Sequence, residues 1–312
     1  MTGSGDRGRR SLLQAGAKVL AGAGAGAAGL LAGGCASMPP MTARGSTEAG
    51  LALWQRAASA HGQDGFAALF DINVAFDGRW HALVQRLQPV LTDGGYRRSS
   101  EERWMPVIGA YAQTHTGAAG VKHVLRRRTV VGEGAQIAVW KNGKPLTGPE
   151  ELSASALIVD AYRLFLLGPL AYSGASAGFD VGEPIWIGRR RCDALLIAQR
   201  PGFGHPGEDK VILYIDRESG LMQRVRLTLE GLTSTQGAIV EVDTEGHVER
   251  HAMRWPTRFF ERLVRPMPNL PVHRWQLTGL DVNRGYSPDA LGSTEHPAFS
   301  GLAAVPARPL AR

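Results

Sequence analysis

Cysteine is scarce in this chain, with only 2 cysteines, Cys35 and Cys192, among 312 residues. One intrachain disulfide is therefore the most that the sequence permits, and none is available if Cys35 is modified. No histidine lies near Cys192 in the sequence, whereas a reactive thiol usually has a base beside it. We therefore interpret Cys192 as a small apolar residue packed in a strand.

Signatures of several enzyme classes are also missing. The chain contains no His-Glu-x-x-His pair and no Gly-x-x-x-x-Gly-Lys-Ser/Thr phosphate loop, and we expect no nucleophile elbow. His205 stands near Glu208 and Asp209 on a segment rich in glycine and proline, which we interpret as a solvated polar loop. The sequence predicts a protein that is not an enzyme and that holds no cofactor.

One pattern typical of a metal site is present. His247, Glu249 and His251 stand at every second position, so a strand would place them on one face, where they could bind zinc. The three acidic residues before them continue the same spacing, so we favour the solvated face of a hairpin around Gly246. We predict no metal site, and a metal-dependent hydrolase that uses His247 and His251 is the least favoured alternative.

The first 34 residues are typical of an export signal. Arg9 and Arg10 form a pair followed by Ser-Leu-Leu-Gln, which resembles a twin-arginine translocation signal. An Ala/Gly/Leu-rich stretch ends in Leu-Ala-Gly-Gly before Cys35, which resembles the lipobox of bacterial lipoproteins, where the cysteine is lipidated. The sequence therefore predicts a protein of the periplasm or cell envelope, lipid-anchored to a bacterial membrane. A cleaved signal without lipidation and an uncleaved spanning helix are the two alternatives.

The signal and the rest of the chain differ in charge. Arg7, Arg9, Arg10, Lys18 and Asp6 contribute +3 of the formal net charge of +7, which leaves +4 for the remainder. This mild excess gives no indication of nucleic-acid binding and suits a surface near anionic lipid head groups. We predict a signal peptide at 1–34, a tether at 35–46 that lets the body stand off the membrane, one folded domain at 47–286 and a flexible C-terminal tail at 287–312.

Hydrophobic periodicity predicts two helices among many short strands. The helix at 47–60 has one apolar face and ends at His61-Gly62. The helix at 153–167 is apolar nearly all round, so we expect it to be buried on several sides. We expect tight turns at Asp77-Gly78 and at Asn142-Gly143. Alternating apolar residues predict strands at 70–76, 80–87, 102–107, 110–115, 121–130, 135–140, 185–187, 194–199, 211–215, 221–229, 238–242, 255–264 and 275–282.

These elements predict a mainly β (α+β) fold, a curved antiparallel half-barrel sheet with helices covering its inner face. Each strand has one solvated face, so the apolar face needs helices as its partner. A ligand cavity can remain between the sheet and the helices. The candidates for residues that line it, whose default role is core packing, are Trp54, Phe70, Val74, Leu157, Ala161, Leu164, Phe165 and Trp275.

Two stretches carry a family resemblance. The order of elements, the hairpin sequence VILYIDRESGLM at 211–222 and the later sequence WPTRF at 255–259 resemble the outer-membrane lipoprotein carrier superfamily, the LolA/LolB-like half-barrels. The resemblance implies binding of an acyl chain or another lipophilic ligand without chemistry. Carriers that shuttle lipoproteins are soluble, whereas this chain is predicted to be lipidated, which is closer to anchored acceptors, lipid-binding lipoproteins or stress sensors.

The sequence thus predicts a lipid-anchored protein that binds a lipophilic ligand or an acylated partner in a half-barrel cavity. Its expected partners are a lipid or acyl chain and the membrane that holds its anchor. The alternative is a non-enzymatic protein-interaction module, such as an envelope-stress regulator, which has a protein partner in the cell envelope and a filled core.

Overall fold

The computed structural model describes residues 37–41, 45–127, 136–174, 177–291 and 303–304. All of them belong to one compact unit, Ala36–Arg312. The predicted signal, with Arg9 and Arg10, and the predicted lipidation site Cys35 lie outside the described residues.

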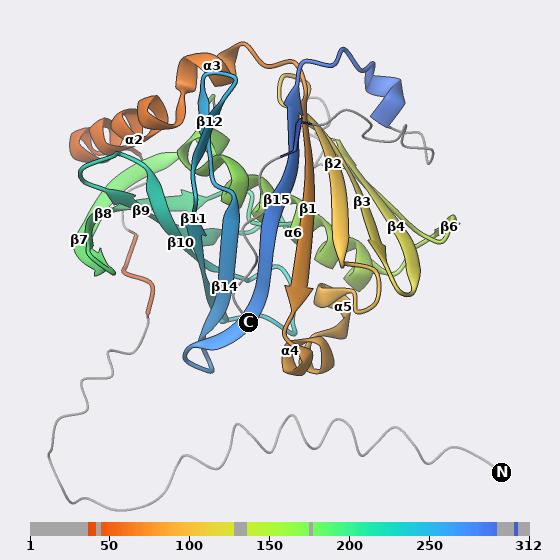
Figure 1. Ribbon diagram of the computed structural model, residues 1–312. Coiled ribbons are helices and arrows are strands. Elements are labelled where there is room, and N and C mark those ends of the chain that lie inside the picture. The colour runs from red at the N-terminus through yellow and green to blue at the C-terminus, as the bar shows by residue number, and fades with distance from the viewer. Residues whose placement is uncertain (1–36, 42–44, 128–135, 175–176, 292–302, 305–312) are drawn as a thin grey trace, which may run out of the picture. The chain divides into compact units, whose positions relative to one another are not determined.

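The described residues form one open antiparallel sheet of 14 strands, which bends around a central helix (Figure 1). The strand order is β6-β5-β4-β3-β2-β1-β15-β14-β11-β10-β9-β8-β7, with β16 paired to β15. The sheet ends at β6 and β7 and is not closed into a barrel. Its strands are β1 (Ile72–Trp80), β2 (Ser99–Met105), β3 (Ala110–Gly117), β4 (Gly120–Arg127), β5 (Gln136–Lys141), β6 (Lys144–Pro145), β7 (Gly178–Ile187), β8 (Arg190–Gln199), β9 (Asp209–Asp216), β10 (Met222–Thr228), β11 (Ile239–Glu245), β14 (Arg258–Arg265), β15 (Leu270–Val282) and β16 (Ala303–Ala304).

The two halves of the sheet are joined by the pairing of β1 with β15. Ile72 lies opposite Val282 and Trp80 opposite His273, so early and late parts of the chain meet at the centre of the sheet. Most other neighbours are consecutive in sequence, as expected for a meander. A separate short hairpin, β12 (Val248–Arg250) and β13 (Met253–Trp255), follows β11.

Helix α6 (Pro149–Leu167) fills the concave face of the sheet, as predicted (Figure 1). Twelve of its residues are buried, because apolar side chains point to nearly all sides. The 3-10 helix η1 (Gly168–Tyr172) follows directly. This segment is long and apolar enough to cross a membrane, but 83% of its apolar window is buried inside the protein, which identifies it as a core helix.

Helix α2 (Glu48–His61) covers the β7–β8 end of the same face, and the predicted helix at 47–60 is confirmed. Thr47 caps it by accepting a hydrogen bond from the Gly50 amide, and Gly62 ends it in the left-handed conformation. The short helices are α3 (Gln63–Ala67) at one end of the sheet, α4 (Ala82–Leu87) and α5 (Pro89–Thr92) at the other, and the 3-10 helix η2 (Pro288–Leu291).

Two predictions about the segment around β1 are wrong. The strand expected at 80–87 is helix α4, because Ala, Leu, Gln and Arg are good helix formers and its apolar residues suit a helix face. The turn expected at Asp77-Gly78 is part of β1, where Gly78 lies opposite Trp275. A Cβ at Gly78 would stand 2.5 Å from His273 Nε2 and 2.9 Å from Trp275 Cβ. The glycine therefore permits a close approach of side chains rather than a turn.

The expected hairpin at Asn142-Gly143 is confirmed, with both residues at positive φ and Lys141 paired with Lys144. Described residues of the predicted tether and of the predicted tail contact the sheet. Met38 and Met41 pack on the convex face, and Leu291 of η2 is buried against Met105.

Candidate functional site

A cleft of about 270 Å³ opens beside the end of α6 and is the candidate ligand site. Three segments surround it: the end of α6 with η1, the β2–β3 hairpin, and the loop between β8 and β9. Its apolar wall includes Phe66, Trp104 and Leu170, and its polar wall includes Arg126, Asp160 and Arg163. A concave site with an apolar wall and a few charged groups is typical of a small-ligand site.

Asp160 organises the polar wall of the cleft. Its carboxylate accepts two hydrogen bonds from Arg126 of β4, at 2.8 Å from Nε and 2.6 Å from Nη2. It also accepts one at 3.0 Å from the Gly204 amide in the β8–β9 loop. A two-pronged arginine–carboxylate pair has a defined geometry. One helical carboxylate thus fixes a strand on one side of the cleft and a loop on the other.

Gly204 lets the β8–β9 loop lie directly on α6. Its φ is +72°, and a Cβ there would stand 2.6 Å from the Leu157 amide nitrogen and 2.8 Å from the Ser153 carbonyl oxygen. Any larger residue would push the loop away from the helix. The loop wall of the cleft therefore depends on this glycine.

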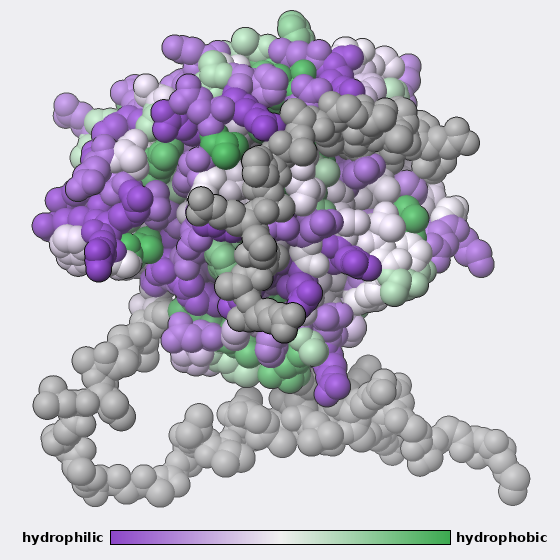
Figure 2. Space-filling model, in the orientation of Figure 1, coloured by the Kyte–Doolittle hydropathy of each residue, from purple (hydrophilic) through white to green (hydrophobic). Residues whose placement is uncertain are grey.

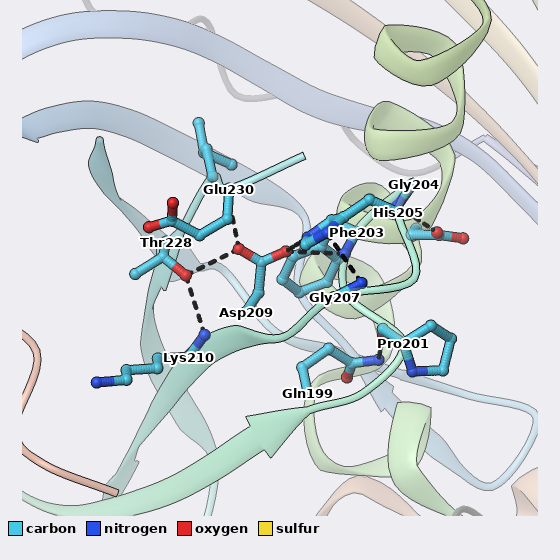
Figure 3. A network of polar contacts seen from close by, with 12 residues as sticks. Gln199, Pro201, Phe203, Gly204, His205, Gly207, Asp209, Lys210, Thr228 and Glu230 are labelled. Carbon is cyan, nitrogen blue, oxygen red and sulfur yellow. Dashed lines mark hydrogen bonds and ion pairs between the residues drawn. The ribbon is translucent and has the colours of Figure 1, made fainter. Parts of the chain in front are cut away.

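A buried carboxylate, Asp209, holds the other end of the same loop (Figure 3). It accepts hydrogen bonds from the Phe203 amide at 2.9 Å, Thr228 Oγ1 at 2.8 Å and the Glu230 amide at 3.0 Å. His205 Nε2 lies 2.7 Å from it, while the Gly207 amide donates to His205 Nδ1 at 3.2 Å. His205 therefore carries its proton on Nε2 and donates to Asp209. The segment at 205–209, which the sequence suggested was merely solvated, is thus held by hydrogen bonds to Asp209, and the neighbouring residues 200–203 line the cleft.

Behind the cleft, the concave face of β2, β3 and β4 is polar and buried. Glu102 accepts hydrogen bonds from Tyr111 Oη and, at 2.9 Å, from Ser100 Oγ. Gln113 connects Tyr111 with His115 through its amide nitrogen and oxygen, at 3.4 and 3.3 Å. Burial raises the pKa of Glu102 and lowers the pKa of His115 well below its usual value. Tyr111 belongs both to this network and to the cleft wall.

Two further polar atoms at the cleft are buried without a partner. Within the described parts of the chain, neither Tyr172 Oη nor Ser173 Oγ has a hydrogen-bond partner. Both residues line the cleft. Because an unpaired buried hydroxyl costs free energy, a ligand with a polar group at this position would relieve that cost.

The eight predicted lining residues do not line this cleft. Six of them are packed in the core with 3% exposure or less: Val74, Leu157, Ala161, Leu164, Phe165 and Trp275. Trp54 is half-buried, stacks on Phe179 at 5.2 Å and donates a hydrogen bond to the Pro169 carbonyl. Phe70 is 72% exposed, so its expected position inside the fold is wrong.

The position of Phe70 has a local cause. Strand β1 begins only at Ile72, after a bend held by Asp71. The buried Asp71 carboxylate accepts hydrogen bonds from the amides of Arg284 and Gly285, and the Phe70 amide donates to Asn283 Oδ1. These bonds set the backbone before the strand, so the inward alternation does not extend back to Phe70.

Aromatic side chains fill the space between α6 and the sheet. Trp275 stacks on Tyr162 at 5.0 Å, on Phe259 at 4.9 Å and on His273 at 4.6 Å. Burial lowers the pKa of His273 well below its usual value, and its Nδ1 lies 2.6 Å from Tyr162 Oη. The predicted lining of the half-barrel is thus mainly a packed core, and the cleft lies at its edge.

The residues considered for metal binding do not converge. His247 packs edge-on to His61, with ring centroids 6.3 Å apart, whereas His251 is exposed in the β12–β13 turn. Burial lowers the pKa values of His61 and His247 to about 4. Across the described ranges, no group of three or more His, Cys, Asp or Glu residues is placed to hold a metal ion.

Cys192 is a packed strand residue, as predicted. It is 0% exposed, and burial raises the pKa of its thiol to about 11. Its neighbours on the convex face include Ala194, Ile212 and Tyr214. A thiol with this pKa is protonated at neutral pH and is a poor nucleophile.

One motif bears on the predicted absence of a nucleophile elbow. Gly174, Ser176 and Gly178 match the Gly-x-Ser-x-Gly pattern, and Gly174 and Ala177 line the cleft. Residues 175 and 176 lie outside the described ranges. A nucleophile elbow joins a strand to a following helix. Here helix η1 precedes the segment and strand β7 follows it, so the flanking elements stand in the opposite order.

One signal for the cleft is present in the sequence, although the hydrophobic pattern obscures it. Asp160 and Arg163 are the only charged residues between 153 and 167 in an otherwise apolar helix. Charged side chains are rarely buried without a partner, so they mark the turn of the helix that faces polar groups. Arg126 and Tyr111 carry no comparable signal, because polar residues are common on strands.

The chain matches no known family model and no curated protein sequence. It is similar in structure to a DUF1329 family protein from Desulfovibrio piger, with a TM-score of 0.49 and 9% identity over 78% of this chain and 98% of that one. It is also similar to an outer membrane lipoprotein-sorting protein domain from Vibrio parahaemolyticus, with a TM-score of 0.46 and 9% identity over 78% and 96% of the two chains.

A third similar structure is a LolA superfamily protein from Nitrosomonas europaea, with a TM-score of 0.37 and 11% identity over 78% of this chain and 97% of that one. These three similarities concern the fold alone. The fold itself, an open antiparallel sheet around a core helix, is established directly by the strand order.

Proposed function

We propose that this chain is a lipid-anchored protein of the bacterial cell envelope that binds a lipophilic ligand, or the acyl chain of an acylated partner, in the cleft beside α6. In this proposal residues 1–34 are a twin-arginine signal, Cys35 carries the lipid, and the folded body faces the periplasm. The protein binds its ligand without chemical change.

The mixed lining of the cleft is the observation that carries the proposal. Phe66, Trp104 and Leu170 offer an apolar wall to an alkyl segment. The charged lining is three arginines and one carboxylate, Asp160, so the cleft carries a net positive charge. An amphipathic molecule with an anionic head matches both walls. A volume of about 270 Å³ is near the lower end for ligand pockets, so we expect it to enclose one chain segment rather than a whole lipid.

The carboxylates near the cleft favour binding over catalysis. Asp160 is engaged by Arg126 and Gly204. Asp209 accepts two hydrogen bonds from the loop that it holds and two more from Thr228 and Glu230. Side chains bound in this way position the cleft walls, whereas a general base needs reach to a substrate proton.

Native mass spectrometry tests the proposal, with organic extraction of whatever the gently purified protein holds. We expect a discrete lipid mass. Ala171→Trp adds a bulky ring to the η1 wall of the cleft and should abolish that mass, whereas Ala82→Trp, on exposed helix α4, should retain it. Retention of the lipid by both variants would show that it binds elsewhere, and a wild-type protein without lipid would contradict the proposal.

The filled concave face favours a second candidate, a protein-interaction module of the cell envelope such as a stress regulator. Trp275, Phe165 and their neighbours occupy the space that a large lipid would need. In this alternative the wild-type protein carries no lipid mass, and the cleft binds an apolar side chain of a protein partner.

A further inference from the structure

The segment that follows the predicted lipidation site is docked on the folded body. Met38 and Met41 are half-buried and pack against the convex-face cluster of Cys192, Ala194, Leu196, Ile212 and Tyr214. The same cluster includes Ile185 and Ile187 of β7. The chain therefore reaches the body at the β7–β8 edge of the sheet, rather than joining it only at α2.

Covalent length limits how far this edge can lie from the anchor. Cys35 stands three residues before Met38, and three extended residues span at most roughly 11 Å. The headgroup layer on each side of a bilayer is itself about 5 to 8 Å thick. A lipid on Cys35 would therefore hold the β7–β8 edge of the sheet, with the hairpin that joins these strands, close to the membrane surface.

The hairpin between β7 and β8 has the side chains that suit this position. Trp186 is 66% exposed and lies opposite Arg191 in the pairing of the two strands. Arg189, Arg190 and Arg191 are all exposed. Arg190 contacts Asp216 at 2.7 Å, yet its side chain is 54% exposed. In Figure 2 the side of the molecule that carries β7 and β8 is mostly hydrophilic.

We propose that the β7–β8 hairpin contacts the headgroup layer of an anionic membrane through Trp186, Arg189, Arg190 and Arg191. This inference rests on the proposed lipid anchor at Cys35. Tryptophan favours the boundary between head groups and acyl chains, and arginine binds lipid phosphates. Each basic residue near an anionic surface adds to the attraction. The anchor and the hairpin together would fix the orientation of the body on the membrane.

A fluorescent probe at position 186 tests this contact in the lipidated full-length protein. Cys192 is buried with a raised pKa and Cys35 is blocked by the lipid, so Trp186→Cys supplies one reactive thiol for the environment-sensitive dye NBD. Phe70→Cys, at another 72% exposed aromatic position, is the matched control. Both proteins are reconstituted into phosphatidylcholine vesicles with or without 30% phosphatidylglycerol.

We expect NBD at position 186 to brighten at least twofold and shift to the blue when phosphatidylglycerol is present, and NBD at position 70 to stay unchanged. Arg189→Glu with Arg191→Glu should abolish the response. Arg79→Glu with Arg86→Glu makes the same change in charge at exposed positions on β1 and α4, and should leave the response intact. Equal NBD responses at positions 186 and 70 would overturn the proposal. Loss of the response only in the variant with Arg79→Glu and Arg86→Glu would overturn it as well.

Flotation of the same samples separates this proposal from the anchor. A lipidated protein floats with phosphatidylcholine vesicles whatever the charge of the hairpin. A protein that floats but gives no signal at position 186 would overturn the hairpin contact alone. A protein that does not float lacks the anchor, which overturns both.

Discussion

The two sides of the concave face of the sheet differ in chemistry. On β9, β10, β11, β14 and β15 most inward side chains are apolar and pack against α6, with Leu213, Val225 and Trp275 almost fully buried. His273 of β15 is an exception. On β2, β3 and β4 the inward positions include Glu102, Gln113 and Lys122, and they are buried as deeply. Apolar burial stabilises a fold directly, whereas buried polar groups stabilise it only when all of their bonds are made.

The difference suggests a division of roles within one sheet. The apolar side provides the packing that holds α6. The polar side supplies a network whose member Tyr111 reaches the cleft, and Arg126 of β4 lines the same cleft. Substitutions on the two sides should therefore differ in what they damage.

The largest effect is expected on the apolar side, from Trp275→Ala. Trp275 is 1% exposed and stacks on three other aromatic rings. Its removal should lower the free energy of unfolding by about 3 to 5 kcal/mol. Urea denaturation measures this, with the exposed Trp186→Ala as the control that changes stability by less than about 0.5 kcal/mol.

Acid should weaken the apolar side through His61. Its Nδ1 contacts the Ala57 carbonyl at 2.8 Å and its Nε2 accepts from the Met222 amide at 3.3 Å, so the ring joins α2 to β10 in its neutral form. Burial lowers its pKa from 6.5 to about 4, and the unfolded chain therefore binds the proton first. The contribution of neutral His61 to the free energy of unfolding is complete above pH 6.5 and is lost as the pH falls toward 4.

The difference between these pKa values corresponds to about 3 kcal/mol. The free energy of unfolding should fall as the pH is lowered from 7 to 4. The slope of this free energy against pH should be smaller in His61→Gln. His247, whose pKa is also lowered to about 4, remains in that variant and keeps part of the slope. An unchanged slope in His61→Gln would contradict the assigned neutral form.

On the polar side, Lys122→Ala should lower stability by about 2 kcal/mol. Lys122 is ion-paired with the buried Asp93, which also contacts Lys141 at 2.7 Å. Loss of one partner of a buried pair usually costs about 3 to 5 kcal/mol. We expect a smaller cost here because Lys141 still contacts the Asp93 carboxylate. The double variant Lys122→Met with Asp93→Asn removes both charges and should be more stable than the single one by urea denaturation. The opposite order would argue against a buried pair.

The smallest effect on stability, about 1 kcal/mol, is expected for Asp160→Asn at the cleft. This change weakens the pair with Arg126 and the bond from Gly204, which hold the β8–β9 loop. Because the loop should then open more often, chymotrypsin should cleave after Phe203, which is 2% exposed in the closed loop, faster than in the wild type. Glu150→Gln, at an exposed position on the same helix, should leave the cleavage rate unchanged.

The sequence predicted the fold well where alternation is regular. The apolar helix at 153–167 and the strands of the meander could be assigned because one period extends over many residues. The segment at 77–87 could not, because Gly78 serves packing against Trp275 and α4 contains apolar residues that also suit a strand. Such positions are decided by contacts between residues distant in sequence.

The candidate site was harder to predict than the fold. The inward polar residues of β2 and β3 look like solvated strand residues in sequence, because Glu102 and Gln113 alternate with the polar Arg103 and Thr114. Only the folded sheet shows which of them α6 covers. Six of the eight predicted lining residues fill the interior that they were expected to surround.

The most direct test of this account is to map where an acyl chain binds, using a photoreactive fatty acid and peptide mass spectrometry. We predict cross-links to η1, near Leu170 and Ala171, and to the β8–β9 loop, near Gly202 and Phe203, which share the cleft. Cross-links to Leu164, Phe165 or Trp275 in the interior would contradict the account. Cross-linking that excess unlabelled fatty acid does not reduce would contradict it as well.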